Sequence, residues 1–219
     1  MSRAVFLDRD GVVNEIVHFP ELGLLDCPLN PDQFRLLPNV SEAIKTLHRL
    51  SFKVIVVSNQ PAIAKGKMTM KLFERIRAKM RRELLKGGAY IDGEYYCFHH
   101  PRAKRVEFRV NCDCRKPKPG LILRAAKDFE LELSKCYTIG DSLTDVKAGK
   151  WVGCRSFLIG SLKCDLCRLM DQMSVRPDLI VSSLYGAAKI IENEVNEGVK
   201  ADLILSSLYE TTKTIKKEV

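Results

Sequence analysis

Two carboxylates, Asp8 and Asp10, follow directly after the short apolar run at residues 4–7. Such a run is typical of a buried strand, so two like charges stand at the rim of the core, where they repel each other and lose hydration. A divalent cation and a phosphoryl group bound there would offset both costs. Acidic residues after strands also cap turns or helices, so the pair alone leaves that second interpretation open.

Other polar side chains also follow apolar runs of the strand type. Ser58 and Asn59 follow residues 54–57, and Asp141 follows residues 136–140. Lys116 is added to them from the loop CDCRKPKPG at residues 112–120. Because the carboxyl ends of parallel strands lie along one edge of a sheet, we expect these side chains to meet the two aspartates there. This convergence favours a functional site over a set of separate caps.

The elements that must position these residues alternate along the chain. Apolar runs at residues 4–7, 54–57, 136–140 and 154–160 are separated by amphipathic patterns at residues 40–50, 65–86, 121–131 and 144–150. Continuous rather than alternating apolar strands, with helices between them, are typical of a parallel sheet covered on both faces. The predicted fold is therefore α/β and doubly wound.

Four segments in this order resemble the motifs of the haloacid dehalogenase superfamily of phosphotransferases. They are FLDRDGVV at residues 6–13, VIVVSN at residues 54–59, Lys116, and GDSLTD at residues 140–145. The resemblance implies a Rossmann-like HAD fold. It also implies a Mg²⁺-dependent phosphomonoesterase that works through an aspartyl phosphate.

The resemblance gives each motif residue a role. Asp8 would be the nucleophile, and Mg²⁺ would lie between Asp8, the phosphate and Asp141, neutralising both reacting anions. Asp10 would act as general acid and then general base, and it would bind the metal through its backbone carbonyl. Ser58 and Lys116 would hold the transferred phosphoryl oxygens.

Asp145, the last residue of the GDSLTD motif, has two interpretations that the sequence leaves open. It could order Lys116 or a metal-bound water. As the third or fourth residue of a helix that starts near Ser142, it could equally favour the helix dipole.

A second constellation lies at residues 97–114. Cys97, His99, Cys112 and Cys114 form two close pairs with twelve residues between them, in a polar and basic loop. Two thiolate-containing pairs with one imidazole suit tetrahedral Zn²⁺ with all four positions filled by protein, which is a structural site. Cys164 and Cys167 form a separate C-x-x-C pair, which we interpret as packing residues or a weak second metal site.

The zinc loop resembles the branch of the superfamily that hydrolyses D,D-heptose 1,7-bisphosphate or histidinol phosphate, where such a loop replaces a cap domain. Within this branch the motifs are most similar to the heptose bisphosphate enzymes, and D-glycero-D-manno-heptose 1,7-bisphosphate is the best match as substrate. The resemblance places Asn59, Gln60 and Arg115 at the substrate, with Arg115 gripping a second phosphate. Pro61, Ala62 and a long insertion at residues 18–38 depart from that pattern.

Several alternatives stay open at this level. Histidinol phosphate or another small phosphate ester could be the substrate. A regulatory protein that keeps the fold without catalysis is a further alternative, which the intact motif residues speak against.

Composition and charge restrict the partners and the compartment. The chain has 219 residues, 46% of them hydrophobic, and a net charge of +9. The start of the chain reaches Asp8 too soon for a signal peptide, and no later apolar stretch approaches membrane-spanning length, so we expect a cytoplasmic enzyme of carbohydrate metabolism. Many basic residues lie on the outer face of the pattern at residues 65–86 without interleaved aromatics, so we expect a small phosphate ester rather than nucleic acid as partner. As a separate expectation, the protein is a monomer or a weak homo-oligomer.

The C-terminal region contains an internal repeat. PDLIVSSLYGAAKIIE at residues 177–192 matches ADLILSSLYETTKTIK at residues 201–216. One copy, a short strand followed by an amphipathic helix, would close the sheet. We therefore predict a catalytic domain at residues 1–193 and an appendage without catalytic role at residues 194–219.

Overall fold

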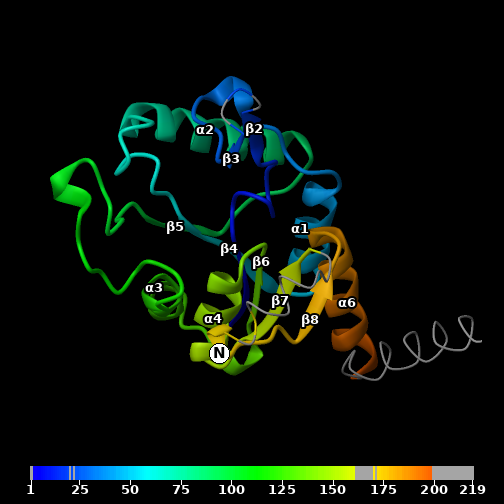
Figure 1. The fold of residues 1–219 in the computed structure, drawn as a ribbon. Helices are drawn as coiled ribbons and strands as arrows, with labels where there is room; N and C mark the ends of the chain where they lie inside the picture. Colours follow the sequence, from blue (N-terminus) through cyan, green and yellow to red (C-terminus); the bar gives the residue numbers. More distant parts are fainter. Residues whose placement is uncertain (1, 20, 22, 161–169, 171, 199–219) are drawn as a thin grey trace, which may run out of the picture.

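The structure is a computed structural model that describes residues 2–160 except 20 and 22, residue 170, and residues 172–198. Within these residues, six parallel strands form one sheet at the centre of the molecule (Figure 1). In spatial order they are β5 (Gly93–Cys97), β4 (Phe52–Asn59), β1 (Arg3–Leu7), β6 (Tyr137–Gly140), β7 (Arg155–Ile159) and β8 (Leu179–Val181). The order places β1, which carries the first motif, between β4 and β6.

Helices cover both faces of the sheet, as Figure 1 shows. Successive strand residues point to opposite faces, so Val5 and Leu7 enter one core cluster while Ala4 and Phe6 enter another. The first cluster is completed by α1 (Val40–Arg49), α2 (Met70–Lys86) and α6 (Leu184–Glu197). The second receives α3 (Gly120–Asp128) and part of α4 (Leu143–Trp151). The predicted doubly wound α/β fold is confirmed.

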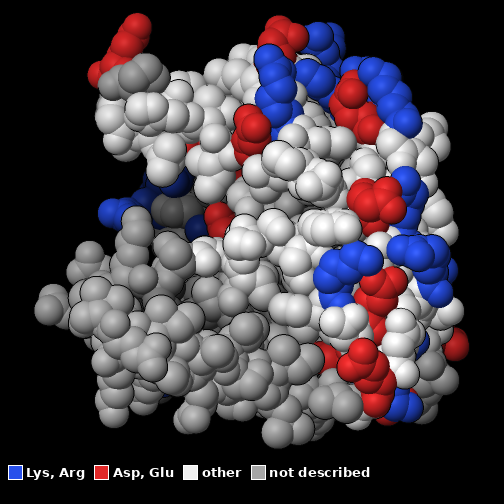
Figure 2. All heavy atoms as spheres, turned by 90° about the vertical axis from the view of Figure 1, so that its right-hand side faces the viewer, with Lys and Arg blue, Asp and Glu red and all other residues white. Residues whose placement is uncertain are grey.

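The basic helix α2 has the predicted amphipathic character. It begins at Met70, where the side chain of Thr69 accepts a hydrogen bond from the Leu72 amide at 3.2 Å. The fourfold spacing within residues 65–86 predicts an apolar face of Leu72, Ile76, Met80 and Leu84; the last three are buried together with Phe73, whereas Leu72 is half-buried and the helix starts five residues later than the pattern. On the face drawn in Figure 2, Lys and Arg side chains lie among Asp and Glu side chains.

Two parts of the fold were not predicted. The edge strand β5 has the sequence GEYYC, in which Cys97 alone is fully buried, so it lacks the apolar run that marks the inner strands. The insertion at residues 18–38 contributes most of an antiparallel hairpin of β2 (Val17–Phe19) and β3 (Leu24–Asp26). The end of the insertion contacts α2, where Lys79 Nζ donates to the Pro31 carbonyl at 2.7 Å; Figure 1 shows both regions at the same end of the molecule. Short 3₁₀ turns occupy Pro31–Gln33, Val106–Phe108 and Leu133–Lys135.

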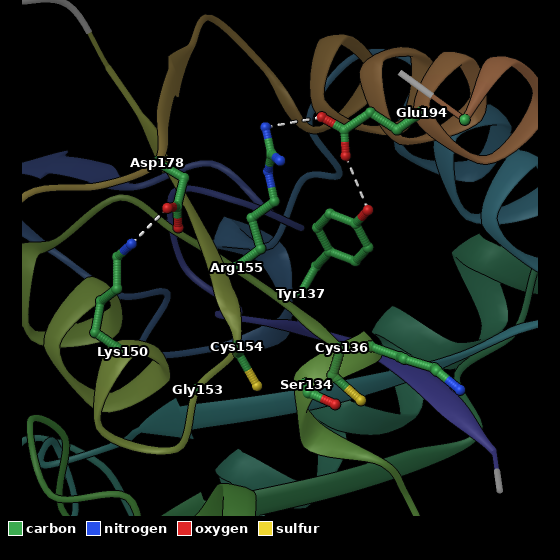
Figure 3. A pocket seen from close by; sticks show the side chains of 11 residues that line it. Ser134, Cys136, Tyr137, Lys150, Gly153, Cys154, Arg155, Asp178 and Glu194 are labelled. Carbon is green, nitrogen blue, oxygen red and sulfur yellow. Dashed lines mark hydrogen bonds and ion pairs between the residues drawn. The ribbon is translucent and has the colours of Figure 1, made fainter. Parts of the chain in front are cut away.

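The first copy of the C-terminal repeat forms β8 and α6, the predicted strand and helix. Helix α6 continues to Glu197, past the predicted domain boundary at residue 193. Glu194 in this helix accepts a hydrogen bond from the Tyr137 hydroxyl at 2.9 Å and pairs with Arg155 at 2.9 Å (Figure 3). These contacts tie the end of α6 to the start of β6 and β7. The second copy, Cys164 and Cys167 lie outside the described residues.

The residues shown in Figure 3 line a hollow of about 520 Å³. It lies at the amino-terminal ends of β6 and β7, away from the edge where the motif residues gather. None of the helices that the structure describes is both long and apolar enough to cross a membrane.

Candidate active site

The motif residues meet at the carboxyl edge of the sheet, around the ammonium group of Lys116. This group lies 3.0 Å from Asp8 Oδ1, forms an ion pair with Asp145, and donates to the Val57 carbonyl at 2.7 Å. Lys116 is 3% exposed. The chain therefore buries one cation between acidic groups that come from the ends of β1 and the start of α4.

Electrostatics at this edge favour an additional cation. Oxygen atoms of Asp8, Asp141 and Asp145 lie within 4.8 Å of one another. Burial, with the charges of Asp8 and Asp145, raises the pKa of Asp141 to about 7. Burial alone would lower the pKa of Lys116, but Asp145 and Asp8 raise it well above its ordinary value. Three carboxyl groups around one ammonium group, all offering oxygen ligands, form a site that a hard dication fits.

Asp145 fulfils both functions that its position in the sequence left open. Its Oδ2 accepts a hydrogen bond from the Ser142 amide at 3.2 Å and completes a capping box at the start of α4. Its Oδ1 pairs with Lys116. The carboxylate thus fixes the helix start and the lysine at the same time, and it also belongs to the group of possible metal ligands.

Gly11 allows the first and fourth motifs to approach each other. Its φ angle is +79°, and a Cβ atom at this position would lie 2.1 Å from Asp141 Oδ2. A glycine is required here both by the left-handed backbone and by the contact with Asp141.

The side chain of Asp10 is held by three groups. Arg9 donates to it from Nε and Nη2 at 2.9–3.2 Å, Asn14 Nδ2 donates at 2.9 Å, and Gln60 Nε2 donates at 2.7 Å. Gln60 Nε2 also donates to Ser58 Oγ at 3.0 Å. The side-chain amide of Gln60 therefore binds both Asp10, the predicted acid/base residue, and Ser58, the predicted phosphate-binding residue. Arg9 and Asn14 were not predicted as functional residues, although both lie in DRDGVVN at residues 8–14.

Asn59 and Gln60, the predicted substrate contacts, bind protein groups in this structure. Asn59 Oδ1 accepts from the Lys116 amide at 3.0 Å, and its Nδ2 donates to the Lys116 carbonyl at 3.1 Å. Gln60 is fully buried, and its backbone N–H donates to the backbone carbonyl of Cys97 at 2.7 Å. Both residues thus connect β4 to the loop that supplies Lys116 and to the end of β5.

The four predicted zinc ligands lie together. Cys97 Sγ is 3.7 Å from Cys112 Sγ and 3.2 Å from Cys114 Sγ, and His99 Nδ1 is 3.3 Å from Cys114 Sγ. Zinc–sulfur bonds of about 2.3 Å in a tetrahedron require sulfur atoms roughly 3.7 Å apart. The cysteines are free thiols, so this cluster could hold a zinc ion.

Arg115 connects this cluster with the edge of the sheet. Its Nη1 donates to the His99 carbonyl at 3.1 Å. It lines a hollow of about 460 Å³ together with Pro101, Arg109, Cys112 and Lys116. The predicted substrate-binding arginine therefore lies at an accessible cavity beside Lys116.

The chain is similar in sequence to several known proteins. Residues 113–187 match the HAD-hydrolase-like family model. The D-glycero-β-D-manno-heptose-1,7-bisphosphate 7-phosphatase of Escherichia coli K12 is 38% identical over 146 residues, which cover 66% of this chain and 72% of that protein. The enzyme of the same name from Haemophilus influenzae is 33% identical over 150 residues, covering 68% of this chain and 76% of that protein.

Solved structures give the same result. The crystal structure of D,D-heptose 1,7-bisphosphate phosphatase from B. bronchiseptica, complexed with magnesium and phosphate, has a TM-score of 0.71 and 27% identity. The match covers 89% of this chain and 99% of that chain. This chain belongs to the HAD superfamily of hydrolases, as its motifs predicted. Within that superfamily it is a phosphatase, and its relatives are the heptose bisphosphate phosphatases just described.

Proposed function

We propose that this phosphatase removes the 7-phosphate of D-glycero-D-manno-heptose 1,7-bisphosphate in a Mg²⁺-dependent reaction. The observation that carries the chemistry is the buried Lys116 between Asp8 and Asp145, with Asp141 beside them. The relatives' names support the substrate.

The chain offers the oxygen ligands that Mg²⁺ prefers. The carboxylates of Asp8 and Asp141 and the backbone carbonyl of Asp10 would hold the ion. When bound, Mg²⁺ neutralises the charge of the phosphate and of the attacking carboxylate. The raised pKa of Asp141 supports this assignment, because without a cation its ionised form is costly.

The residues of the chain then divide the reaction into two steps. Asp8 Oδ1 is held by Lys116 and by the Arg9 amide at 2.7 Å, so we assign Oδ2 to the attack on phosphorus. Asp10 protonates the leaving alkoxide as the aspartyl phosphate forms. Asp10 then takes a proton from the water that hydrolyses this intermediate. Ser58 and Lys116 bind the phosphoryl oxygens during both steps.

Arg115 would bind the phosphate that stays on the sugar. A guanidinium group can donate two parallel hydrogen bonds to a phosphate. Its contact with the His99 carbonyl supports this role, because the Cys/His cluster then sets the direction of the arginine.

A substrate panel tests the proposed function. Heptose 1,7-bisphosphate, histidinol phosphate and several sugar monophosphates are compared by kcat/KM with added Mg²⁺. We expect heptose 1,7-bisphosphate to be preferred by about 10²-fold or more, since losing a bidentate phosphate contact costs a few kcal/mol. A preference for histidinol phosphate would replace the proposed substrate. Absence of chelator-sensitive phosphate release from all compounds would show a protein that binds without catalysis.

We also propose that the Cys97, His99, Cys112 and Cys114 cluster holds a structural Zn²⁺. The prediction is that Cys114→Ser abolishes stoichiometric zinc and lowers the melting temperature by about 6–12 °C. This corresponds to roughly 3 kcal/mol for a chain of this size. Metal analysis and a thermal melt measure both effects. Cys154→Ala, which removes another buried thiol, is the control and should keep its zinc. Equal zinc content in the two variants would count against the site.

The contact between Gly11 and Asp141 gives a further prediction. Gly11→Ala should raise the Mg²⁺ concentration needed for half-maximal activity by about 10-fold or more, because the new methyl group displaces the Asp141 carboxylate. Gly153→Ala is the matched control, since Gly153 has φ +80° but open space around its Cβ position. The same shift in both variants would mean that backbone strain, rather than the clash, causes the effect.

A further inference from the structure

Arg9, the residue between the two motif aspartates, has an unusual environment for an arginine. It is 0% exposed and is the largest fully buried side chain in the part of the chain that the structure describes. Its guanidinium carbon lies 5.7 Å from the centre of the Phe73 ring on α2. The side chain is therefore buried between the ring of Phe73 and the carboxylate of Asp10.

Stability alone does not explain this burial. A buried arginine loses its hydration, and its ion pair with one carboxylate seldom repays the whole cost. Arg9 Nη1 has no hydrogen-bond partner among the described residues, which adds to the penalty. An apolar side chain of similar length would fill the space beside Phe73 without either cost.

The Arg9 guanidinium group binds the carboxylate of Asp10. Nη2 lies 2.9 Å from Oδ1 and 3.0 Å from Oδ2, and Nε lies 3.2 Å from Oδ1. Asn14 adds a donor to Oδ1, and Gln60 adds one to Oδ2. Both carboxylate oxygens are thus held from several directions. The Asp10 side chain remains 17% exposed, so a ligand can still reach it.

We propose that Arg9 is a positioning residue that fixes the Asp10 carboxylate against the leaving-group oxygen, with Asn14 and Gln60 as its partners. The inference rests on the proposed function, because it assigns a task to the environment of the proposed acid/base residue. Arg9 does not touch the substrate. It acts through the orientation of Asp10.

The proposal predicts a selective loss of activity. An alkyl phosphate needs a proton on its leaving oxygen, whereas p-nitrophenyl phosphate releases a stable phenolate. The value of kcat/KM reports the steps up to formation of the aspartyl phosphate. Misplacing Asp10 should therefore lower kcat/KM for the alkyl ester by about 10²-fold or more and for the nitrophenyl ester by about threefold or less. A residue that only supports the fold would lower both equally.

The experiment compares Arg9→Met with wild-type protein on p-nitrophenyl phosphate and on the alkyl ester with the highest kcat/KM in the substrate panel. Arg155→Met is the control, because it removes a remote arginine that is mostly buried and paired with Glu194. This control should leave the ratio of the two kcat/KM values unchanged. Asp10→Asn should change the ratio in the same direction as Arg9→Met. If Arg9→Met does not fold, Arg9→Lys provides the test, since a single ammonium group cannot reproduce the forked contact.

The outcomes separate the two claims. A ratio changed by about 30-fold or more in an Arg9 variant with a wild-type-like melting temperature supports the positioning role. An equal loss on both esters, while Asp8→Asn is inactive, overturns the role of Arg9 and leaves the proposed function intact. Wild-type turnover in Asp8→Asn would instead overturn the proposed function itself.

Discussion

The Asp8→Asn variant is expected to release phosphate at least about 10⁴-fold more slowly than the wild-type protein. The amide cannot attack phosphorus to form an acyl phosphate, and removal of a nucleophile has effects of this order in other enzymes. The measurement is phosphate release from heptose 1,7-bisphosphate at saturating Mg²⁺. The fold should be retained, because the side chain keeps its size and can still accept from Lys116 and from the Arg9 amide.

Asp128→Asn is the matched control for this variant. Asp128 is an exposed carboxylate on α3 that accepts a hydrogen bond from the Tyr95 hydroxyl at 2.6 Å, away from the motif residues. It should keep wild-type activity. Turnover by Asp8→Asn comparable to this control would remove Asp8 from the reaction.

The Lys116→Met variant should have the second-largest effect, with kcat/KM lowered by about 10³-fold. The ammonium group would contact the phosphoryl oxygens as charge moves onto them, and loss of one such contact costs about 10²–10³. Asp8 and Asp145 also lose their shared cation, which should destabilise the fold by about 3–5 kcal/mol. Kinetics and thermal unfolding measure the two effects separately.

A double variant distinguishes them further. Lys116→Met combined with Asp145→Asn removes one of the two uncompensated charges, so it should recover part of the stability without recovering activity. Lys127→Met, an exposed lysine on α3, serves as the control for loss of a lysine. Full activity in the double variant would show that Lys116 serves the fold alone.

Much of this site could be predicted from the sequence because its residues lie at points fixed by strand geometry. Asp8 and Asp141 each follow an inner strand with a continuous apolar run, and adjacent parallel strands place such residues side by side. The grouping of Cys97, His99, Cys112 and Cys114 was predictable for a different reason, since two close pairs of soft ligands have few other uses in a polar loop.

Other features depend on tertiary contacts that no local pattern records. The edge strand β5 is mostly half-buried, so its sequence shows no apolar run. Arg9 is buried beside the ring of Phe73 on α2, a residue far from it in the chain. The double function of Asp145 arises because Lys116, from a distant loop, reaches the start of α4. Short-range spacing suggested each function of Asp145 separately but could not combine them.

If Asp8 is the nucleophile, it must carry the phosphoryl group during turnover, and that residue can be identified chemically. Wild-type protein is mixed with Mg²⁺ and substrate, quenched within milliseconds, treated with borohydride and mapped by peptide mass spectrometry. We expect Mg²⁺-dependent conversion of Asp8 to homoserine, the reduction product of an aspartyl phosphate. Modification of a different residue, or rapid turnover with Asp8 unmodified at every quench time, would contradict it.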